Sequence, residues 1–285
     1  MNLRQVRKKT KSVTNVKKIT KSMQLVSAIK MKRAQQAAIE AKPYQEQLEA
    51  IINRVMYKKN ESISSLLVKP KIEKKFLRII ISANKGLCGS FNIDLLRYLL
   101  KNNEKNKTDY IVVGKKAATF VSKIGETILA DFSSNQSLNN VSAIFTMVIN
   151  SFLSGTYSKV SIIYNAFIST LKTETVEHTL LPFSLTSELK KESVKHLQNE
   201  YIIEPNPEDI IDSLLKSYLK DKIRNSIVQS EAGEHSARMI AMKNATDNAN
   251  DVIYNLTLLG NKLRQEKITN ELLDMITAKE SVGTV

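Results

Sequence analysis

Hydrophobic residues at the start of the chain recur at steps of three and four positions. Residues 3–57 contain no glycine and one proline, Pro43. Such spacing is typical of a helix, and over many turns it indicates a coiled-coil seam. We predict one long helix that Pro43 bends or interrupts, because proline removes a backbone donor and crowds the preceding turn. The recurring positions are Val13, Val16, Ile19, Met23, Val26, Ala34, Ala37, Ala41, Tyr44, Leu48, Ile51 and Val55.

The same periodicity returns at the end of the chain, which has no proline after Pro207. A continuous helix of this length would span roughly 110 Å. A compact globule of the whole chain would be only about 50 Å across, so we expect this helix to protrude and to pair with the first helix in antiparallel fashion. Its distal part should extend beyond that partner. Its apolar positions are Ile211, Leu214, Tyr218, Leu256, Leu259, Leu263, Leu272 and Met275.

Alanines follow a strict four-residue step within the second helix, at Ala237, Ala241, Ala245 and Ala249. Small side chains on one face would let two helix backbones approach closely, so these four residues form a candidate helix seam. The alternative is that alanine is simply the best helix former.

Between the two helices the pattern changes to short β-branched runs separated by helical stretches. Strands are predicted at 76–82, 110–114 and 159–169, with weaker candidates near 127–130 and 176–181. This alternation indicates a small α/β domain with a mainly parallel sheet. The expected fold is therefore α/β with long helices, an antiparallel coiled coil of the two terminal helices plus a central Rossmann-like domain. The expected division is residues 1–59, 60–207 and 208–285.

Charge is concentrated on the first helix. Residues 1–59 hold 15 Lys/Arg against 3 Asp/Glu, whereas the whole chain has a net charge of +15. The first 39 residues contain no acid. Such a helix favours an acidic partner, which could be nucleic acid, anionic lipid or an acidic protein surface. The alternative is a solvated lysine-rich face.

Composition argues against several classes of protein. No apolar run is long enough to span a bilayer, and no short apolar segment follows the basic N-terminus as in a secretory signal. The one cysteine, Cys88, cannot form an internal disulfide, which fits a reducing compartment. The scattered histidines offer no metal site. The first expectation is a cytoplasmic protein.

The loop 82–92, SANKGLCGSFN, follows a predicted strand and opens a helix, as a phosphate-binding loop would. It lacks the spacing of the known glycine-rich nucleotide motifs. We therefore expect Gly86 and Gly89 to serve a tight turn and Cys88 to be a small buried hydrophobe. His178 and His235 have no nucleophile or paired carboxylate at catalytic spacing. We predict a mechanical or binding protein without a catalytic site and without a cofactor.

Three tracts in order carry a family resemblance: ITKSMQLVSAIKMKRAQ, NKGLCGSFN and EHSARMIAMKNATDNAND. Together they resemble the gamma subunit of F-type ATP synthases over essentially the whole chain. The resemblance implies a central-stalk rotor that couples proton or sodium flow to conformational cycling of the catalytic ring. The implied partners are the alpha and beta subunits, the epsilon subunit and the membrane c-ring. The implied location is peripheral, on the cytoplasmic side of a bacterial inner membrane.

The resemblance also implies contact residues. Lys21, Met23, Arg264 and Gln265 would contact the catalytic ring. Tyr201, Glu204 and Pro205 would lie near the membrane rotor and the epsilon subunit. Met23 could equally be seam packing and Glu204 a solvated loop acid. One departure is Asn84–Lys85, where the family commonly has an Asp–Arg pair.

Two other readings compete. A basic coiled-coil nucleic-acid-binding protein would use the first helix, although residues 1–43 contain no aromatic residue for base stacking. A nucleotide-dependent enzyme would use the central domain.

Overall fold

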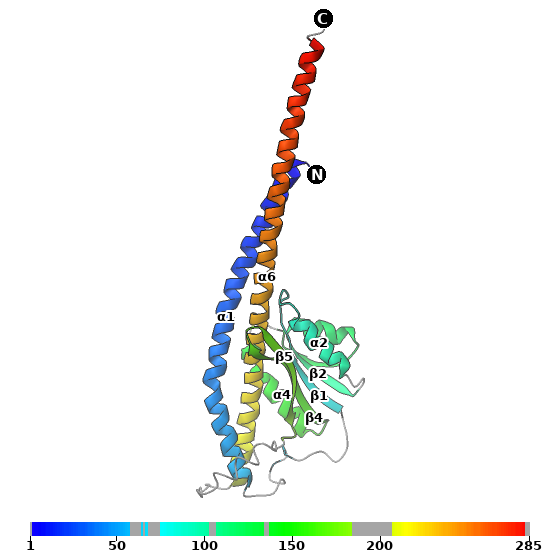
Figure 1. Cartoon of the computed structure of the whole chain (residues 1–285). Coiled ribbons are helices and arrows are strands. Elements are labelled where there is room, and N and C mark those ends of the chain that lie inside the picture. The colour runs from blue at the N-terminus through cyan, green and yellow to red at the C-terminus, as the bar shows by residue number, and fades with distance from the viewer. Residues whose placement is uncertain are drawn as a thin grey trace. The chain divides into compact units, whose positions relative to one another are not determined.

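The computed structural model describes residues 2–57, 64, 66–67, 75–102, 107–133, 137–183 and 207–282. Two long helices, α1 (Leu3–Tyr57) and α6 (Pro207–Val282), are the first and last elements of the chain (Figure 1). The chain forms two compact units, one of residues 28–238 and one that combines residues 1–27 with residues 239–285. The predicted fold class, long terminal helices with a central α/β domain, is confirmed.

The larger unit is built on a five-stranded sheet with the order β3-β2-β1-β4-β5. Neighbouring strands are parallel except for the hairpin of β4 and β5. The central strand β1 is buried over its last five residues, as expected for a parallel strand covered on both faces. The strands are β1 (Lys75–Ile81), β2 (Thr108–Val113), β3 (Ile128–Asp131), β4 (Tyr157–Ser169) and β5 (Lys172–Leu181).

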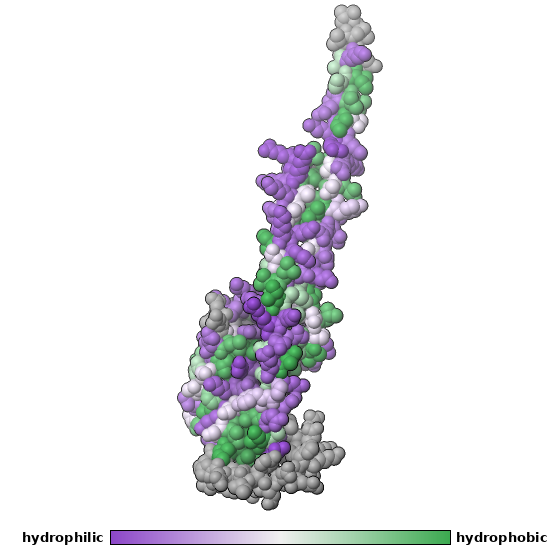
Figure 2. All heavy atoms as spheres, turned by 90° about the vertical axis from the view of Figure 1, so that its left-hand side faces the viewer, coloured by the Kyte–Doolittle hydropathy of each residue, from purple (hydrophilic) through white to green (hydrophobic). Residues whose placement is uncertain are grey.

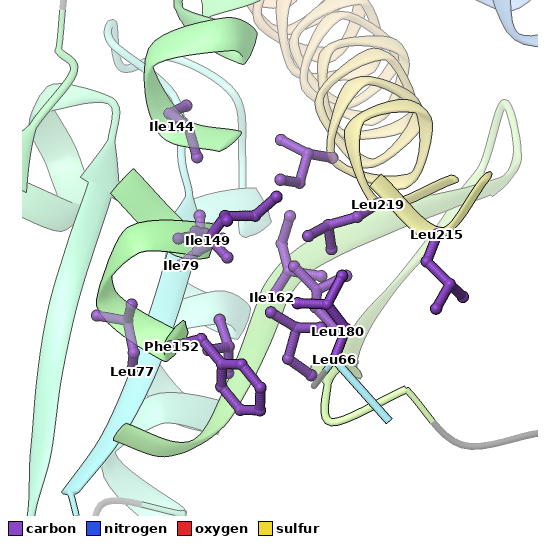
Figure 3. Close-up of a cluster of buried hydrophobic side chains, with 14 of the residues drawn as sticks. Leu66, Leu77, Ile79, Ile144, Ile149, Phe152, Ile162, Leu180, Leu215 and Leu219 are labelled. Atoms are coloured by element: carbon purple, nitrogen blue, oxygen red, sulfur yellow. The ribbon is translucent and has the colours of Figure 1, made fainter. Parts of the chain in front are cut away.

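Each face of the sheet has its own apolar cluster. On one face, α2 (Phe91–Lys101) and α3 (Lys115–Lys123) pack against Ile80, Val112 and Ile163. On the other face, α4 (Val141–Leu153), which follows the short helix η1 (Ser137–Asn140), packs together with part of α6 (Figure 3). Leu48, Ile52 and Val55 of α1 belong to the same cluster. Leu215 and Leu219 of α6 belong to this second cluster, so the long helix supplies part of the core of the α/β domain.

Contacts between α1 and α6 show antiparallel pairing in each unit. In the larger unit the Tyr218 hydroxyl donates to Oε1 of Glu49 at 2.8 Å, and the Asn225 amide donates to Oε1 of Gln45 at 2.9 Å. In the smaller unit the hydroxyls of Thr20 and Thr246 are 2.8 Å apart. Positions that rise along α1 therefore meet positions that fall along α6.

The predicted seam of α1 is partly wrong. Val16, Ile19 and Val26 are 50–59% exposed, and Tyr44 and Ile51 are also exposed. The predicted positions Leu48 and Val55 are buried, and the buried positions also include the small polar residue Ser27. They include Val6, Ser27, Leu48, Ile52 and Val55.

Two further expectations concern the course of the helices. We predicted that Pro43 bends or interrupts the helix. The interruption is wrong, because α1 continues through this residue, and the bend stays a prediction. The end of α6 extends past its partner as predicted: Gly260 lies opposite Val6, near the first turn of α1, and described positions beyond Leu263 are exposed. Leu259, Leu272 and Met275 are therefore not seam positions within this chain.

Candidate functional site: the loop 82–92, its contact with α6, and the helical tip

Polar side chains of the loop 82–92 form hydrogen bonds with nearby backbone amides. The Asn92 side chain accepts a hydrogen bond from the Ala83 amide at 3.1 Å, and the Asn84 side chain accepts one from the Lys115 amide at 3.0 Å. Leu87 and Gly89 adopt positive φ angles of 63° and 58°. The predicted role in a tight turn is therefore confirmed for Gly89, whereas Leu87 and not Gly86 has the other positive φ. The exposed Leu87 is the unusual member, because bulky residues rarely adopt this conformation.

In open α/β sheets, ligands bind at the carboxyl ends of the strands where the strand order reverses. Here that position lies between β1 and β4. It is filled by Ala83, Cys88 and Phe91 of the loop, with Ala237 of α6 packed against them. The amide of Asn165 on β4 donates to the Phe91 carbonyl at 2.6 Å and ties the loop to the sheet. Side chains of the chain itself are thus buried together at this position.

The approach of α6 to this position depends on a glycine. A Cβ atom on Gly233 would lie 3.0 Å from Cγ2 of Thr173 and 3.3 Å from Cε2 of Phe91. One turn further, the Ser236 hydroxyl donates to the carbonyl of Thr170, in the turn between β4 and β5. Two separate segments of the domain therefore contact the same stretch of α6.

Arg238 of α6 adds an ion pair and hydrogen bonds to this contact. Its side chain is 9% exposed and forms an ion pair with Glu234, with 2.6 Å between Nη2 and Oε1. The same guanidinium donates to the carbonyl oxygens of Lys85 and Gly86, each at 3.3 Å. We call this set of contacts the clasp: Gly233 against Phe91 and Thr173, Ser236 with Thr170, and Arg238 with Glu234 and with the carbonyls of Lys85 and Gly86.

Burial shapes the titration of groups beside the clasp. Burial, together with the positive charges of Arg238 and Lys30, lowers the pKa of His235 to about 4, so its ring is neutral at pH 7. Burial also raises the pKa of the Cys88 thiol. Nδ1 of His235 lies 3.3 Å from Nη1 of Arg238, and it is the acceptor there because a guanidinium can only donate.

The smaller unit carries a basic groove of about 530 Å³ between α1 and α6. Arg7, Lys11 and Lys18 line it from α1, and Arg264 lines it from α6. Arg264 and its neighbour Gln265 are exposed. No acidic residue lies among the residues that line the groove, so the lining is net positive.

Beyond the groove, α6 exposes apolar residues among charged ones. Leu272, Leu273, Met275 and Ile276 near the end of α6 are each more than half exposed. Figure 2, which views the α1 side, shows hydrophobic side chains among hydrophilic ones along the helices. Exposed apolar residues gathered in this way indicate a surface for a partner.

The other predicted site residues lie at several places. Lys21 is exposed and Met23 is half-buried in the smaller unit. Ala249 is buried and Ala241 and Ala245 are half-buried in that unit, and Ala237 is half-buried in the larger one. Tyr201, Glu204 and Pro205 lie outside the described residues.

Sequence reasoning missed the clasp. The available signal was Glu234 and Arg238 at i and i+4 within a tract already noted for its mixed polar character, because this spacing favours an ion pair on a helix. What the spacing could not show was that two loop carbonyls accept from the same guanidinium.

The described residues contain no group of three or more His, Cys, Asp or Glu that could hold a metal ion. No helix within the described ranges is long and apolar enough to cross a bilayer. Two long paired helices, an α/β domain whose ligand crevice is filled by the chain itself, and an exposed helical tip define a structural subunit that works through contacts with other chains.

Comparisons with known proteins identify the class more closely. The family described as ATP synthase matches residues 2–282. The ATP synthase gamma chain of Methylacidiphilum infernorum is 35% identical, over 98% of this chain and 99% of the relative. The gamma chain of Clostridium perfringens strain 13 is 36% identical, over 98% of each.

Solved structures show the same fold. The Euglena gracilis mitochondrial ATP synthase, in a structure of OSCP, F1 and the c-ring, has a chain that matches with a TM-score of 0.66 and 19% identity, over 99% of this chain and 96% of that one. The central stalk and c-ring structure of the Tetrahymena thermophila enzyme matches with a TM-score of 0.57 and 24% identity, over 80% and 99%. The chain belongs to the ATP synthase gamma chain family.

Proposed function

We propose that the chain is the rotating central-stalk subunit of an F-type ATP synthase. The observation that carries this conclusion is the full-length relation to gamma chains at 35% identity, supported by the pair of long helices and the α/β domain. The chain is not an enzyme by itself, and catalysis belongs to the beta subunits of the assembly. The comparisons give no support to the nucleic-acid alternative.

The partners we propose at the helical tip are the alpha and beta subunits. The partners we propose near Tyr201, Glu204 and Pro205 are the epsilon subunit and the c-ring. Because α6 extends past the start of α1 in the smaller unit, the tip is a single helix with exposed leucines, methionine and isoleucine. A single off-centre helix presents different contacts to each catalytic subunit. Those unequal contacts give the differential free energy that a shift between conformational states requires.

We propose Lys21, Met23, Arg264 and Gln265 as contacts to the catalytic ring. Arg264 and Gln265 are exposed, and Arg264 belongs to the basic groove. A guanidinium in a groove without acids suits carboxylates of a partner, which it can bind with two parallel hydrogen bonds. Tyr201, Glu204 and Pro205 remain the proposed contacts to the rotor and the epsilon subunit.

We also propose a peripheral location on the cytoplasmic side of a bacterial inner membrane, and the division of the chain into residues 1–59, 60–207 and 208–285. Proton or sodium translocation would take place in other subunits. The coupling ion is a property of those chains.

Affinity purification of the tagged chain from its own cells tests the proposal. We expect alpha- and beta-type ATPase subunits to co-purify in stoichiometric amounts, and the preparation to hydrolyse ATP. Recovery of the chain without either subunit, or with nucleic acid as its main partner, would refute the assignment.

A charge reversal tests the groove within the same assembly. Replacing Arg7, Lys11 and Lys18 by Glu should reduce ATP synthesis and hydrolysis, because three attractive charges become repulsive. Replacing Lys115, Lys116 and Lys123, three exposed lysines of α3, by Glu changes the net charge equally and serves as the control. Equal activity of the two variants would show that the groove does not contact an acidic surface.

A further inference from the structure

We propose that the clasp is the joint that carries torque between the α/β domain and α6. This inference rests on the proposed function as a rotor and adds to it a route through the chain. A rotor that receives force at its α/β domain must pass that force to the long helix without slipping. The question is therefore which contacts of the larger unit resist rotation of α6 about its own axis.

Most of the contact between α6 and the domain is apolar. Ile211, Leu215, Leu219, Ile223 and Ile227 pack into the core beside the sheet. Burial of apolar surface is favourable but non-directional. Packing holds α6 against the domain, and directional contacts are needed in addition to fix its angle.

The clasp supplies directional contacts of this kind. Arg238 donates to two successive carbonyls of the loop 82–92, and Ser236 donates to Thr170 in the turn between β4 and β5. Hydrogen bonds weaken steeply when their angle departs from linearity. Because the acceptors come from two separate segments, rotation of α6 in either direction strains at least one of them.

The guanidinium is itself fixed in place. Glu234 holds the guanidinium through a charge-assisted bond of 2.6 Å, and the side chain of Arg238 is only 9% exposed. Burial strengthens such a bond and reduces its screening by salt. Arg238 is thus held on its own helix while it reaches the loop, as a joint between two bodies requires.

Glycine at 233 brings the helix close enough for these bonds. Any side chain there would meet Thr173 and Phe91 at 3.0–3.3 Å. Phe91 and Cys88 are buried in one cluster, and Ala237 of α6 packs against it. A place that holds a ligand in other α/β domains serves here to seat the helix.

The test uses the complete ATP synthase in membrane vesicles. Arg238→Lys keeps the charge, but an ammonium cannot reproduce the planar, multidentate geometry that serves two carbonyls and Glu234. Arg224→Lys, at an exposed arginine of α6 in the same unit, is the matched control. We measure ATP hydrolysis, the number of ions pumped per ATP, and hydrogen exchange of peptides from residues 82–92.

We expect Arg238→Lys to leave hydrolysis by the detached catalytic sector near the wild-type rate and to lower the ions pumped per ATP. Exchange of the loop amides should become roughly ten- to a hundredfold faster, because a charged hydrogen-bond network is lost. The Arg224→Lys enzyme should match the wild type in all three measurements. Unchanged ion pumping per ATP in Arg238→Lys would overturn the proposal.

Two arrangements keep the result clear. If Arg238→Lys does not assemble, Ser236→Ala decides the matter, because it removes only the bond to Thr170; we expect a smaller loss of coupling, and full coupling overturns the proposal. Co-purification of the wild-type chain with alpha and beta subunits is measured first. Its failure would refute the rotor assignment, whereas assembly with fully coupled clasp variants would refute the joint alone.

Discussion

A buried ion pair inside the sheet offers the sharpest test of the energetics. Arg78 of β1 lies 3.4 Å from Glu177 of β5, measured from Nε to Oε1, and the two side chains are 10% and 16% exposed. The Asn102 carbonyl accepts from Arg78 at 2.7 Å, and the Ser161 hydroxyl donates to Glu177 at 2.7 Å. We consider the variants Glu177→Gln and Arg78→Met and the double variant.

Removing one partner of a buried pair leaves the other charge buried without compensation, which costs about 3–5 kcal/mol. Each single variant should be destabilised by that amount. In the double variant no charge remains buried, and the main loss is the donor to the Asn102 carbonyl, about 1–3 kcal/mol. The double variant should therefore be more stable than the sum of the singles predicts, by at least about 3 kcal/mol.

Urea unfolding of the full chain measures these differences. The chain has no tryptophan and nine tyrosines, so the signal is tyrosine fluorescence, to which Tyr98, Tyr110, Tyr157 and Tyr164 of the α/β domain contribute. Glu174→Gln on the same strand is the control, because Glu174 pairs with Lys172 at 4.0 Å with both side chains more than half exposed. Its cost should stay below about 1 kcal/mol.

Two results would contradict this account of the Arg78–Glu177 pair. If either single variant costs less than about 1 kcal/mol, the charges are solvated to an extent that their burial does not indicate. If the double variant equals the sum of the singles, the two groups do not interact. Raising the salt concentration should leave the effect of Glu177→Gln nearly unchanged, since a buried pair is little screened.

Three further predictions concern other parts of the chain. Gly114→Ala should destabilise the domain by about 3 kcal/mol or more, seen as loss of folded protein, because Gly114 has a φ of 106° and a Cβ atom would lie 2.1 Å from a backbone oxygen. Gly260→Ala should instead stabilise by up to about 1 kcal/mol in urea unfolding, because helix propensity rises and the new Cβ meets Val6 at an ordinary 3.6 Å. His235, whose pKa falls to about 4 through burial and nearby cations, stays neutral when folded. The unfolded chain gains a proton first as the pH falls from about 6.5, so stability present above that pH should decline toward pH 4 by about 1–2 kcal/mol, after discounting for partial exposure. His235→Gln should remove this part of the slope.

Much of the fold follows from the sequence because periodicity is a local property. The steps of three and four in α1 and α6, and the β-branched runs of β1, β2 and β4, predict each element without any knowledge of its partner. The antiparallel pairing of the helices followed from their length and apolar faces.

The face of α1 that forms the seam could not be predicted in this way. Apolar residues occur on two stripes of the helix, and hydropathy favours the stripe with Val16, Ile19 and Val26, which is exposed. The buried stripe includes Thr20 and Ser27, whose small side chains allow close contact. Choosing between the stripes requires the register with α6.

The clasp escaped prediction for a related reason. Arg238 is one basic residue among many, and its role depends on carbonyl oxygens of the loop, 152 positions earlier for Gly86. Backbone acceptors leave no trace in residue types. Arg78, by contrast, could have been found, since a charged residue within the apolar run FLRIIIS requires a partner.

The burial of Cys88 has a practical consequence for attaching a label to this protein. It is the chain's one cysteine, it is 2% exposed, and burial raises its pKa, so little reactive thiolate is present at neutral pH. A cysteine introduced at an exposed position such as Ser122 on α3 would react with a maleimide far faster than the native thiol. A chain with that one added cysteine can therefore carry a fluorophore or a bead at a chosen point. Its rotation can be followed without first replacing the buried Cys88.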